Sequence, residues 1–172
     1  EVIDKFSCFV NPERHIPERV SEVTNITDDM VKDAETIEQV FPKMLEFLGD
    51  QKETIIVAHN ANFDVGFLKQ NAKRLGYEFD YSYLGTLSLA KDLFPNYKKY
   101  KLGIIAENLG IKVEVAHRAL DDVKTLVAVF KVMIEKAKDR DATKVCDFDN
   151  KFETDFKKLP SYHAIILAKN YV

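Results

Sequence analysis

The sequence predicts an α/β domain in which a sheet is flanked by helices. Short apolar runs typical of strands alternate along the chain with longer stretches whose apolar residues recur every three to four positions, as in amphipathic helices. This alternation is the pattern of a layered α/β fold. With 46% hydrophobic residues among 172, the chain can bury one good core.

The N-terminal elements are a strand followed by turns. Residues 2–10 place apolar side chains on one face, as a strand does, and Asn11-Pro12 ends the pattern. Residues 17–33 are expected to form short helices and turns around the segment TNIT, residues 24–27.

A capped helix comes next. Thr36 and Gln39 have the spacing of a capping box, and Gly49 is suited to end the helix. Pro42 lies within the apolar pattern and has no backbone N–H to donate, so we expect a bend or a late helix start there.

The remainder of the domain alternates between strands and helices. In order, we expect a buried strand at 55–60, a helix at 62–76, a strand at 77–84, helices at 86–94 and 102–109, a short strand at 111–115 and a long helix at 119–137.

The C-terminal part has a different composition. Residues 138–160 are highly charged and poorly periodic, which is typical of a linker or a solvated helix. After Pro160 the chain becomes apolar and strand-like again, and residue 1 already adjoins a predicted strand. We therefore expect the sequence to be part of a longer protein.

Composition excludes several classes of protein. Cys8 and Cys146 are far apart, and neither has a second Cys or a His at ligand spacing. Neither a disulfide framework nor a zinc site is predicted, and a reducing cytoplasm is the simplest setting. No apolar run is long enough to span a membrane. The net charge of −3 opposes tight nucleic-acid binding through charge alone, but it does not exclude a nuclease whose metal ions neutralise the phosphate.

One chemical cluster lies at the start of the long helix, where His117 precedes the adjacent Asp121 and Asp122. Acids in a first helical turn are often ordinary stabilisation by the helix dipole. Helix phase separates the two, because Asp122 begins an apolar stripe and Asp121 leans toward the charged side. The stripe continues through Leu126, Val129 and Met133. A buried carboxylate needs a partner, so Asp122 is the candidate functional residue and Asp121 is expected to be solvated.

A second cluster, HNANFDV, follows the buried strand at 55–60. Asp64 lies in the first helical turn, where open α/β sheets commonly place ligand sites. Asn60 and Asn62 have a simpler explanation as helix caps. Phe63 and Phe67, four residues apart, are most simply core residues.

Together the two clusters resemble a known enzyme family. N-x-x-F-D at 60–64, followed by H-x-x-x-x-D from His117 to Asp122, is similar to the second and third motifs of the DEDDh exonucleases. These DnaQ-like enzymes have a ribonuclease H-like fold. TNIT also resembles the family's T-G-I-T segment, which faces the substrate terminus, with Asn25 in place of glycine. Since Asn tolerates a left-handed backbone, we expect Asn25 to adopt one.

The resemblance implies two-metal hydrolysis of phosphodiesters. Asp64 and Asp122 would be two of four carboxylates that hold two Mg²⁺ or Mn²⁺ ions, and His117 would be the general base for the attacking water. The residues implied to contact the substrate are Ile26, Asn60 and Phe63.

A narrower resemblance concerns the whole chain. EVIDKF, ITDDMVKDA, VAHNANFD and HRALDD together are most similar to the exonuclease domain of PolC-type DNA polymerase III, which is inserted in a PHP domain. This implies an exonuclease domain at 1–137, a linker at 138–160 and the start of a resumed PHP segment at 161–172. The implied partners are a single-stranded or frayed 3′ end of DNA, the polymerase and PHP domains of the same chain, and the replisome.

Two features depart from the family pattern. The first motif, D-x-E, which supplies the other two carboxylates, does not precede the predicted strand at 2–10, and that strand resembles the third of the family fold. We therefore expect a ribonuclease H-like fold that lacks its first strands and a chain that is inactive as it stands. Gly85 and Gly103 stand where the family usually has Asp, each just before a predicted helix.

The expected function is proofreading, the removal of mispaired 3′ nucleotides for a replicative bacterial polymerase. One alternative is a stand-alone or helicase-fused exonuclease that acts on DNA or RNA. Another is a degenerate module that binds a primer end without catalysis. The missing acids and the two glycines favour the degenerate module, whereas the presence of His117, Asp64 and Asp122 favours an enzyme.

Overall fold

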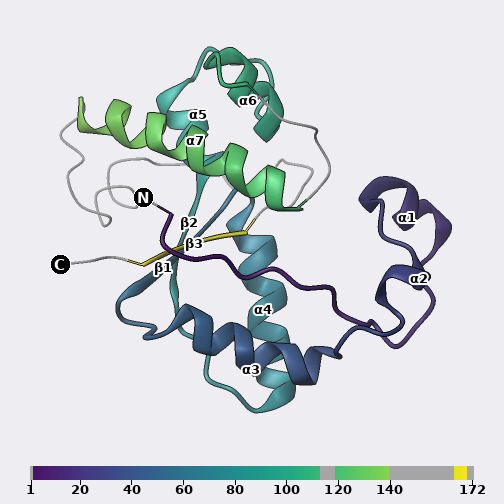
Figure 1. Ribbon diagram of the computed structural model, residues 1–172. Coiled ribbons are helices and arrows are strands. Elements are labelled where there is room, and N and C mark those ends of the chain that lie inside the picture. The colour runs from purple at the N-terminus through teal and green to yellow at the C-terminus, as the bar shows by residue number, and fades with distance from the viewer. Residues whose placement is uncertain (1, 113–118, 140–164, 170–172) are drawn as a thin grey trace.

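A computed structural model describes residues 2–112, 119–139 and 165–169 of the chain. In these residues a three-stranded sheet has the order β2-β1-β3, with helices on both faces (Figure 1). The central strand β1 (Thr54–Ala58) is parallel to β2 (Ser82–Gly85) and antiparallel to β3 (Ile165–Lys169). This mixed sheet flanked by helices agrees with the fold class that the sequence predicts.

The two faces of the sheet have separate apolar cores because successive strand residues point to opposite sides. Ile56 packs with α3 (Ile37–Leu48) and α4 (Ala61–Leu75) on one face. Val57 packs on the other face with three helices. These are α5 (Thr86–Leu93), α6 (Leu102–Asn108) and α7 (Ala119–Lys138).

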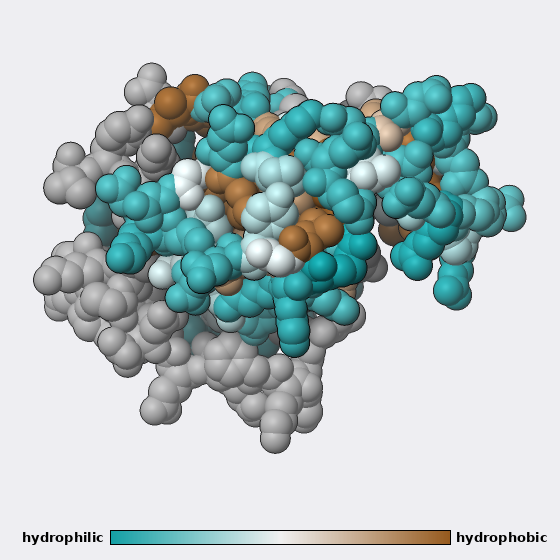
Figure 2. Space-filling model, turned by 90° about the horizontal axis from the view of Figure 1, so that it is seen from below, coloured by the Kyte–Doolittle hydropathy of each residue, from teal (hydrophilic) through white to brown (hydrophobic). Residues whose placement is uncertain are grey.

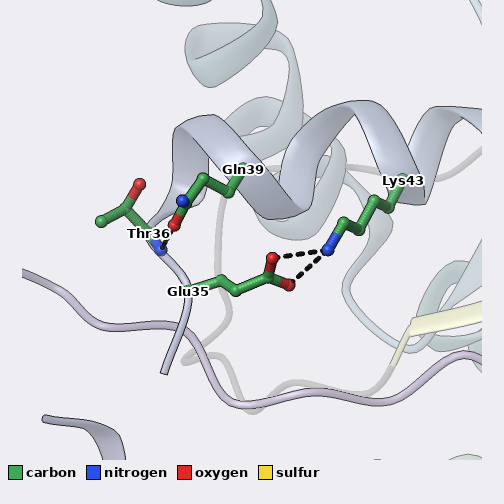
Figure 3. A network of polar contacts seen from close by, with 4 residues as sticks. All are labelled: Glu35, Thr36, Gln39 and Lys43. Carbon is green, nitrogen blue, oxygen red and sulfur yellow. Dashed lines mark hydrogen bonds and ion pairs between the residues drawn. The ribbon is translucent and has the colours of Figure 1, made fainter. Parts of the chain in front are cut away.

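Local signals in the sequence set the start of α3. The backbone N–H of Thr36 donates to Gln39 Oε1 over 2.9 Å, as part of the predicted capping box (Figure 3). Beside it, Lys43 Nζ lies 2.5 Å from Glu35 Oε1. The helix begins at Ile37 and runs through Pro42, so the expected late start is wrong. The cap holds the first turn in place ahead of the proline.

The segment TNIT connects two short helices, α1 (Glu18–Thr24) and α2 (Asp28–Val31). Asn25 has φ +56° and ends α1 with its N–H donated to Ser21 O over 2.8 Å. The left-handed backbone predicted for Asn25 is therefore confirmed.

The strand expected at residues 2–10 is not present. Residues 2–9 are exposed, and only an isolated bridge from Asn11 to Thr36 follows them. None of the described strands pairs with this segment, and the ring of Phe6 lies 5.4 Å from that of Phe47 in α3. An alternating pattern forms a strand only where a neighbouring strand pairs with it.

Two other predicted strands differ from expectation. Of the strand expected at 77–84, only Ser82 onward pairs with β1, and the pairing extends to Gly85. In the strand expected at 111–115, Ile111 and Lys112 are irregular and the rest lies outside the described residues.

The apolar run near the C-terminus forms β3 within the same sheet. It pairs along β1 from Thr54–Lys169 to Ala58–Ile165, so both edges of β1 are paired. The predicted start of a PHP segment at residue 161 remains a prediction. Of the linker predicted at 138–160, Lys138 still belongs to α7 (Ala119–Lys138), and residues 140–160 lie outside the described residues.

The surface differs in polarity from one region to another. Seen from below, the molecule presents a mostly hydrophilic face with apolar side chains gathered near its centre (Figure 2). In the described part of the chain, no helix is both long and apolar enough to cross a membrane.

Candidate active site

The carboxyl end of β1 carries the residues of the second motif. The strand ends at Ala58, and α4 starts three residues later at Ala61. Asn60 precedes the helix, and its carbonyl accepts the N–H of Phe63 over 2.9 Å, but its side chain makes no capping bond. Asn62 lies inside α4, and its Oδ1 accepts the hydroxyl of Tyr83 over 3.2 Å. Asn60 therefore occupies the N-cap position of α4 without a side-chain capping bond, and the expected capping by Asn62 is wrong.

His59 is a buried residue of this motif that sequence reasoning passed over. Its Nε2 lies 2.8 Å from the Tyr100 carbonyl and its Nδ1 lies 3.0 Å from Thr86 Oγ1. A carbonyl only accepts, so Nε2 carries the proton and Nδ1 accepts the Thr86 hydroxyl. Burial lowers the pKa of His59, which keeps the ring neutral, although the Tyr100 contact opposes this shift. His59 thus ties the end of β1 to α5 and to the segment before α6.

Asp64 is 4% exposed and lies in the first turn of α4, facing the interior. Burial raises the pKa of its carboxyl to about 6, although a hydrogen bond from its own backbone N–H opposes the shift. The predicted position of Asp64, in the first helical turn after a buried strand, is therefore confirmed. Its catalytic role remains a prediction.

The desolvated carboxyl of Asp64 should make the free energy of unfolding depend on pH. A folded-state pKa of about 6, against a usual 3.8, means that the folded chain holds the proton more tightly than the unfolded chain. Stability is then lost as pH rises from about 4 to about 6 and stays reduced above that. Asp64→Asn should raise the free energy of unfolding by on the order of 2–3 kcal/mol at pH 7.5 and have little effect at pH 3.5.

Thermal unfolding in EDTA at the two pH values measures this effect. Asp80→Asn is the matched control, because Asp80 is exposed and its replacement should change stability by less than about 0.5 kcal/mol at either pH. A gain for Asp64→Asn that is equal at both pH values would contradict the role of desolvation.

The aspartate pair at the start of α7 differs from expectation. Leu126, Val129 and Met133 form the predicted apolar stripe, each 0% exposed. However, both Asp121 and Asp122 are half-buried. The Asp121 side chain is only 19% exposed, and Lys124 one turn on bonds its Oδ1 over 2.9 Å. The expectation of a solvated Asp121 is therefore wrong.

Other candidates are spread over the fold. His117 lies outside the described residues, and whether Asp64 and Asp122 share a metal site remains a prediction. Ile26 is half-buried in the loop between α1 and α2, and Asn60 is half-buried beside Asp64. Phe63 and Phe67 are 50% and 57% exposed, so their assignment to the core is wrong. Both project from the side of α4 that faces away from the sheet.

The two glycines that replace family aspartates have different positions. Gly85 precedes α5 as its N-cap, and a Cβ there would lie 3.7 Å from Ala61 Cβ, an ordinary contact. Gly103 is already inside α6, whose N-cap is Lys101. The expectation that Gly103 precedes its helix is wrong, since the helix begins one residue earlier.

Sequence comparison decides the family. The family described as Exonuclease matches residues 1–130. The chain belongs to this exonuclease family. The solved structure of Exonuclease X in complex with 5′ overhanging duplex DNA is similar to it, with a TM-score of 0.63 and 26% identity over 80% of this chain and 77% of that one. The ribonuclease H-like fold predicted from the motifs agrees with this neighbour.

Curated relatives match the exonuclease domain over nearly its whole length. DNA polymerase III PolC-type from Clostridium perfringens is 43% identical and that from Caldanaerobacter subterraneus is 41% identical, each over 99% of this chain. A third, from Staphylococcus haemolyticus, is 33% identical over 98%. The chain spans 12% of the length of each of these relatives.

The donor set of this exonuclease domain suits a hard divalent cation. Carboxylate oxygens are the ligands that Mg²⁺ and Mn²⁺ prefer. A cation beside Asp64 would lower the pKa that burial raises and hold the carboxylate ionised. Among the described residues, no three His, Cys, Asp or Glu side chains gather at one point. The described part of the chain therefore offers individual ligands and not a complete cage.

Proposed function

We propose that this chain is the 3′→5′ exonuclease domain of a PolC-type DNA polymerase III and removes mispaired 3′ nucleotides. The observation that carries the proposal is the buried Asp64 of the N-x-x-F-D motif, held at the carboxyl end of β1 with a raised pKa. A desolvated carboxyl at a functional position of an α/β sheet is typical of a site that binds a cation or moves protons. The identity of 43% with a PolC-type relative supports the polymerase assignment.

The residues have separate roles in this proposal. Asp64 and Asp122 would hold divalent metal, Mg²⁺ or Mn²⁺, with carboxylates from an upstream D-x-E motif. When bound, two such ions supply charge stabilisation on the phosphate and activation of water. His117 would take the proton of the attacking water. Asn60, Phe63 and Ile26 would position the terminal nucleotide.

The setting of the domain follows from the same proposal. The substrate would be a single-stranded or frayed 3′ end of DNA, in line with the DNA bound to Exonuclease X. The polymerase and PHP domains would be part of the same longer chain, as in the PolC-type relatives, and the replisome of the bacterial cytoplasm would be its wider partner. No described feature favours a helicase-fused or RNA-directed enzyme.

A direct test compares two lengths of chain. The 172-residue chain should not trim a labelled single strand in Mn²⁺, because two of the four expected carboxylates are absent and Asp64 with Asp122 cannot hold two ions alone. A version extended upstream through a D-x-E motif should trim the strand from its 3′ end. Gel analysis of products distinguishes 3′ from 5′ degradation.

Either of two results would contradict the proposal. Robust trimming by the 172-residue chain would mean that the acidic ligands come from elsewhere in it. No trimming by the extended chain would favour a module that binds a primer end without catalysis.

A further inference from the structure

The link between β1 and α4 is anchored by His59, which is 5% exposed. Its Nδ1 lies 3.0 Å from Thr86 Oγ1, and its Nε2 lies 2.8 Å from the Tyr100 carbonyl. Its own carbonyl accepts the N–H of Leu87 over 2.9 Å. These three bonds reach the first turn of α5 and the residue before the N-cap of α6.

The backbone bond of His59 replaces a helix cap. Gly85 is the N-cap of α5 and has no side chain with which to cap the helix. An N-cap side chain ordinarily accepts the N–H of the second or third helical residue. Leu87 is the second residue of α5, and its N–H goes to the His59 carbonyl instead. His59 therefore holds the start of α5 in the place of the missing cap.

On its other side, His59 leads directly to the helix that carries Asp64. Asn60 follows it and makes no side-chain capping bond. The Asn60 carbonyl accepts the N–H of Phe63 over 2.9 Å and that of Asp64 over 3.4 Å. The first turn of a helix has backbone donors without partners inside the helix and opens most readily. The position of this turn therefore depends on residues 59 and 60, which the His59 ring fixes.

The elements that meet at His59 lead to both proposed metal ligands. Asp64 lies on α4, which packs on one face of the sheet. Asp122 lies on α7, which packs with α5 and α6 on the other face (Figure 1). His59 bonds α5 and the segment before α6, and the next residue begins α4. It therefore connects the two layers of helices at the carboxyl end of β1.

We propose that His59 is a positioning residue that fixes Asp64 relative to Asp122, so that the two carboxylates hold catalytic metal together. The inference rests on the proposed function. Groups of a catalytic site must be held within about 0.5 Å of their productive geometry, and a misplacement of about 1 Å can cost on the order of 10²-fold in rate. A ring bonded through both nitrogens has a fixed orientation and transmits it to the backbone that starts α4.

Substitution of Thr86 tests this anchor without changing the motif. Thr86→Val keeps the shape of the side chain but removes the hydroxyl that donates to His59, whereas Thr86→Ser keeps the hydroxyl. In a chain extended upstream through the acidic motif, Thr86→Val should lower kcat for trimming about 10-fold and change KM less than about threefold. Thr86→Ser should stay within about threefold of the wild type in both. Rates are measured at saturating Mg²⁺, well below the melting temperature of the least stable variant.

Thr54→Val is the matched control. Thr54 is 2% exposed at the other end of β1, and its hydroxyl donates to the Leu48 carbonyl over 2.8 Å. The substitution removes the same kind of buried hydrogen bond, so it should lower the melting temperature about as much as Thr86→Val. Because this end of β1 lies away from the motif, kcat should stay within about threefold of the wild type. A loss that followed stability alone would be equal in the two valine variants.

Hydrogen exchange provides a readout without metal. His59→Leu removes both bonds of the ring and should lower kcat about 10- to 100-fold. In EDTA, the backbone amides of Phe63 and Asp64 should exchange faster in this variant, because the first turn of α4 loses its anchor. The amides of Leu68 and Ala72, in the body of α4, should keep their rates. NMR of the extended chain measures both sets, and Thr86→Val should show the same pattern to a smaller extent.

The outcomes separate this inference from the proposed function. If the wild-type extended chain does not trim, the proposed function fails and the inference falls with it. If the wild type trims and Thr86→Val trims as fast as Thr86→Ser, His59 is not a positioning residue and the exonuclease proposal stands. Unchanged exchange at Phe63 and Asp64 in both anchor variants would overturn the inference in the same way. A lower kcat in Thr86→Val, with retention in Thr86→Ser and Thr54→Val, would support it.

Discussion

Asp64→Asn, in a chain extended upstream through the acidic motif, is expected to reduce Mg²⁺-dependent trimming of a single-stranded 3′ end by at least about 10³-fold. A metal ligand contributes several kcal/mol of charge stabilisation in the transition state, and each 1.4 kcal/mol is tenfold in rate. The same substitution should stabilise the fold at pH 7.5, because it removes the buried carboxyl whose pKa burial raises to about 6. Loss of activity with gain of stability is a combination that unfolding cannot produce.

The adjacent aspartates at the start of α7 provide the matched comparison. Asp122→Asn should reduce trimming as severely as Asp64→Asn, whereas Asp121→Asn should reduce it less than about tenfold, because Asp121 already bonds Lys124 over 2.9 Å. Initial rates at saturating Mg²⁺ measure both. Since the two side chains are both half-buried, equal losses would show that helix phase does not separate their roles.

His117→Ala is expected to slow trimming by about 10²–10⁴-fold, the usual contribution of a general base. Metal binding should be largely intact, because a base that acts on water is not itself a ligand. Single-turnover rates at increasing Mn²⁺, with calorimetric titration of Mn²⁺, separate the two effects. Full recovery of the rate at high Mn²⁺ would recast His117 as a ligand or a structural residue.

The pH profile adds a check on that assignment. With His117 in place, the rate should rise with pH as the imidazole loses its proton and becomes able to accept one from water. In His117→Ala this limb should disappear. No limb near pH 6 should remain from Asp64, because a bound cation lowers the pKa of its carboxyl and holds it ionised.

Helix boundaries were predictable where a local signal exists. The capping box of Thr36 and Gln39 sets the start of α3, and Gly76 sets the end of α4. Each signal lies within one helical turn of the helix end that it sets. Asn25 adopts the left-handed backbone for the same reason, because its own side chain decides how costly that backbone is. The position of Asp64 in the first turn after β1 also follows from neighbouring residues in the sequence.

Strand pairing was less predictable because it depends on distant residues. Residues 2–10 alternate as a strand does, but no described strand pairs with them. The run at 165–169 joins β1, more than one hundred residues away in the sequence, where the backbone of β1 offers a complementary edge. Periodicity describes which side chains share a face and leaves open which backbone they pair with.

The sequence by itself determined the motif residues, the family they resemble and the helix on which each carboxylate lies. Only the tertiary structure decided how much water reaches each side chain. It buries Asp64 and shifts its pKa, engages both nitrogens of His59 and leaves Phe63 and Phe67 exposed on α4. The physical reason is that motif identity and helix phase are local properties, whereas desolvation sums over neighbours from the whole chain.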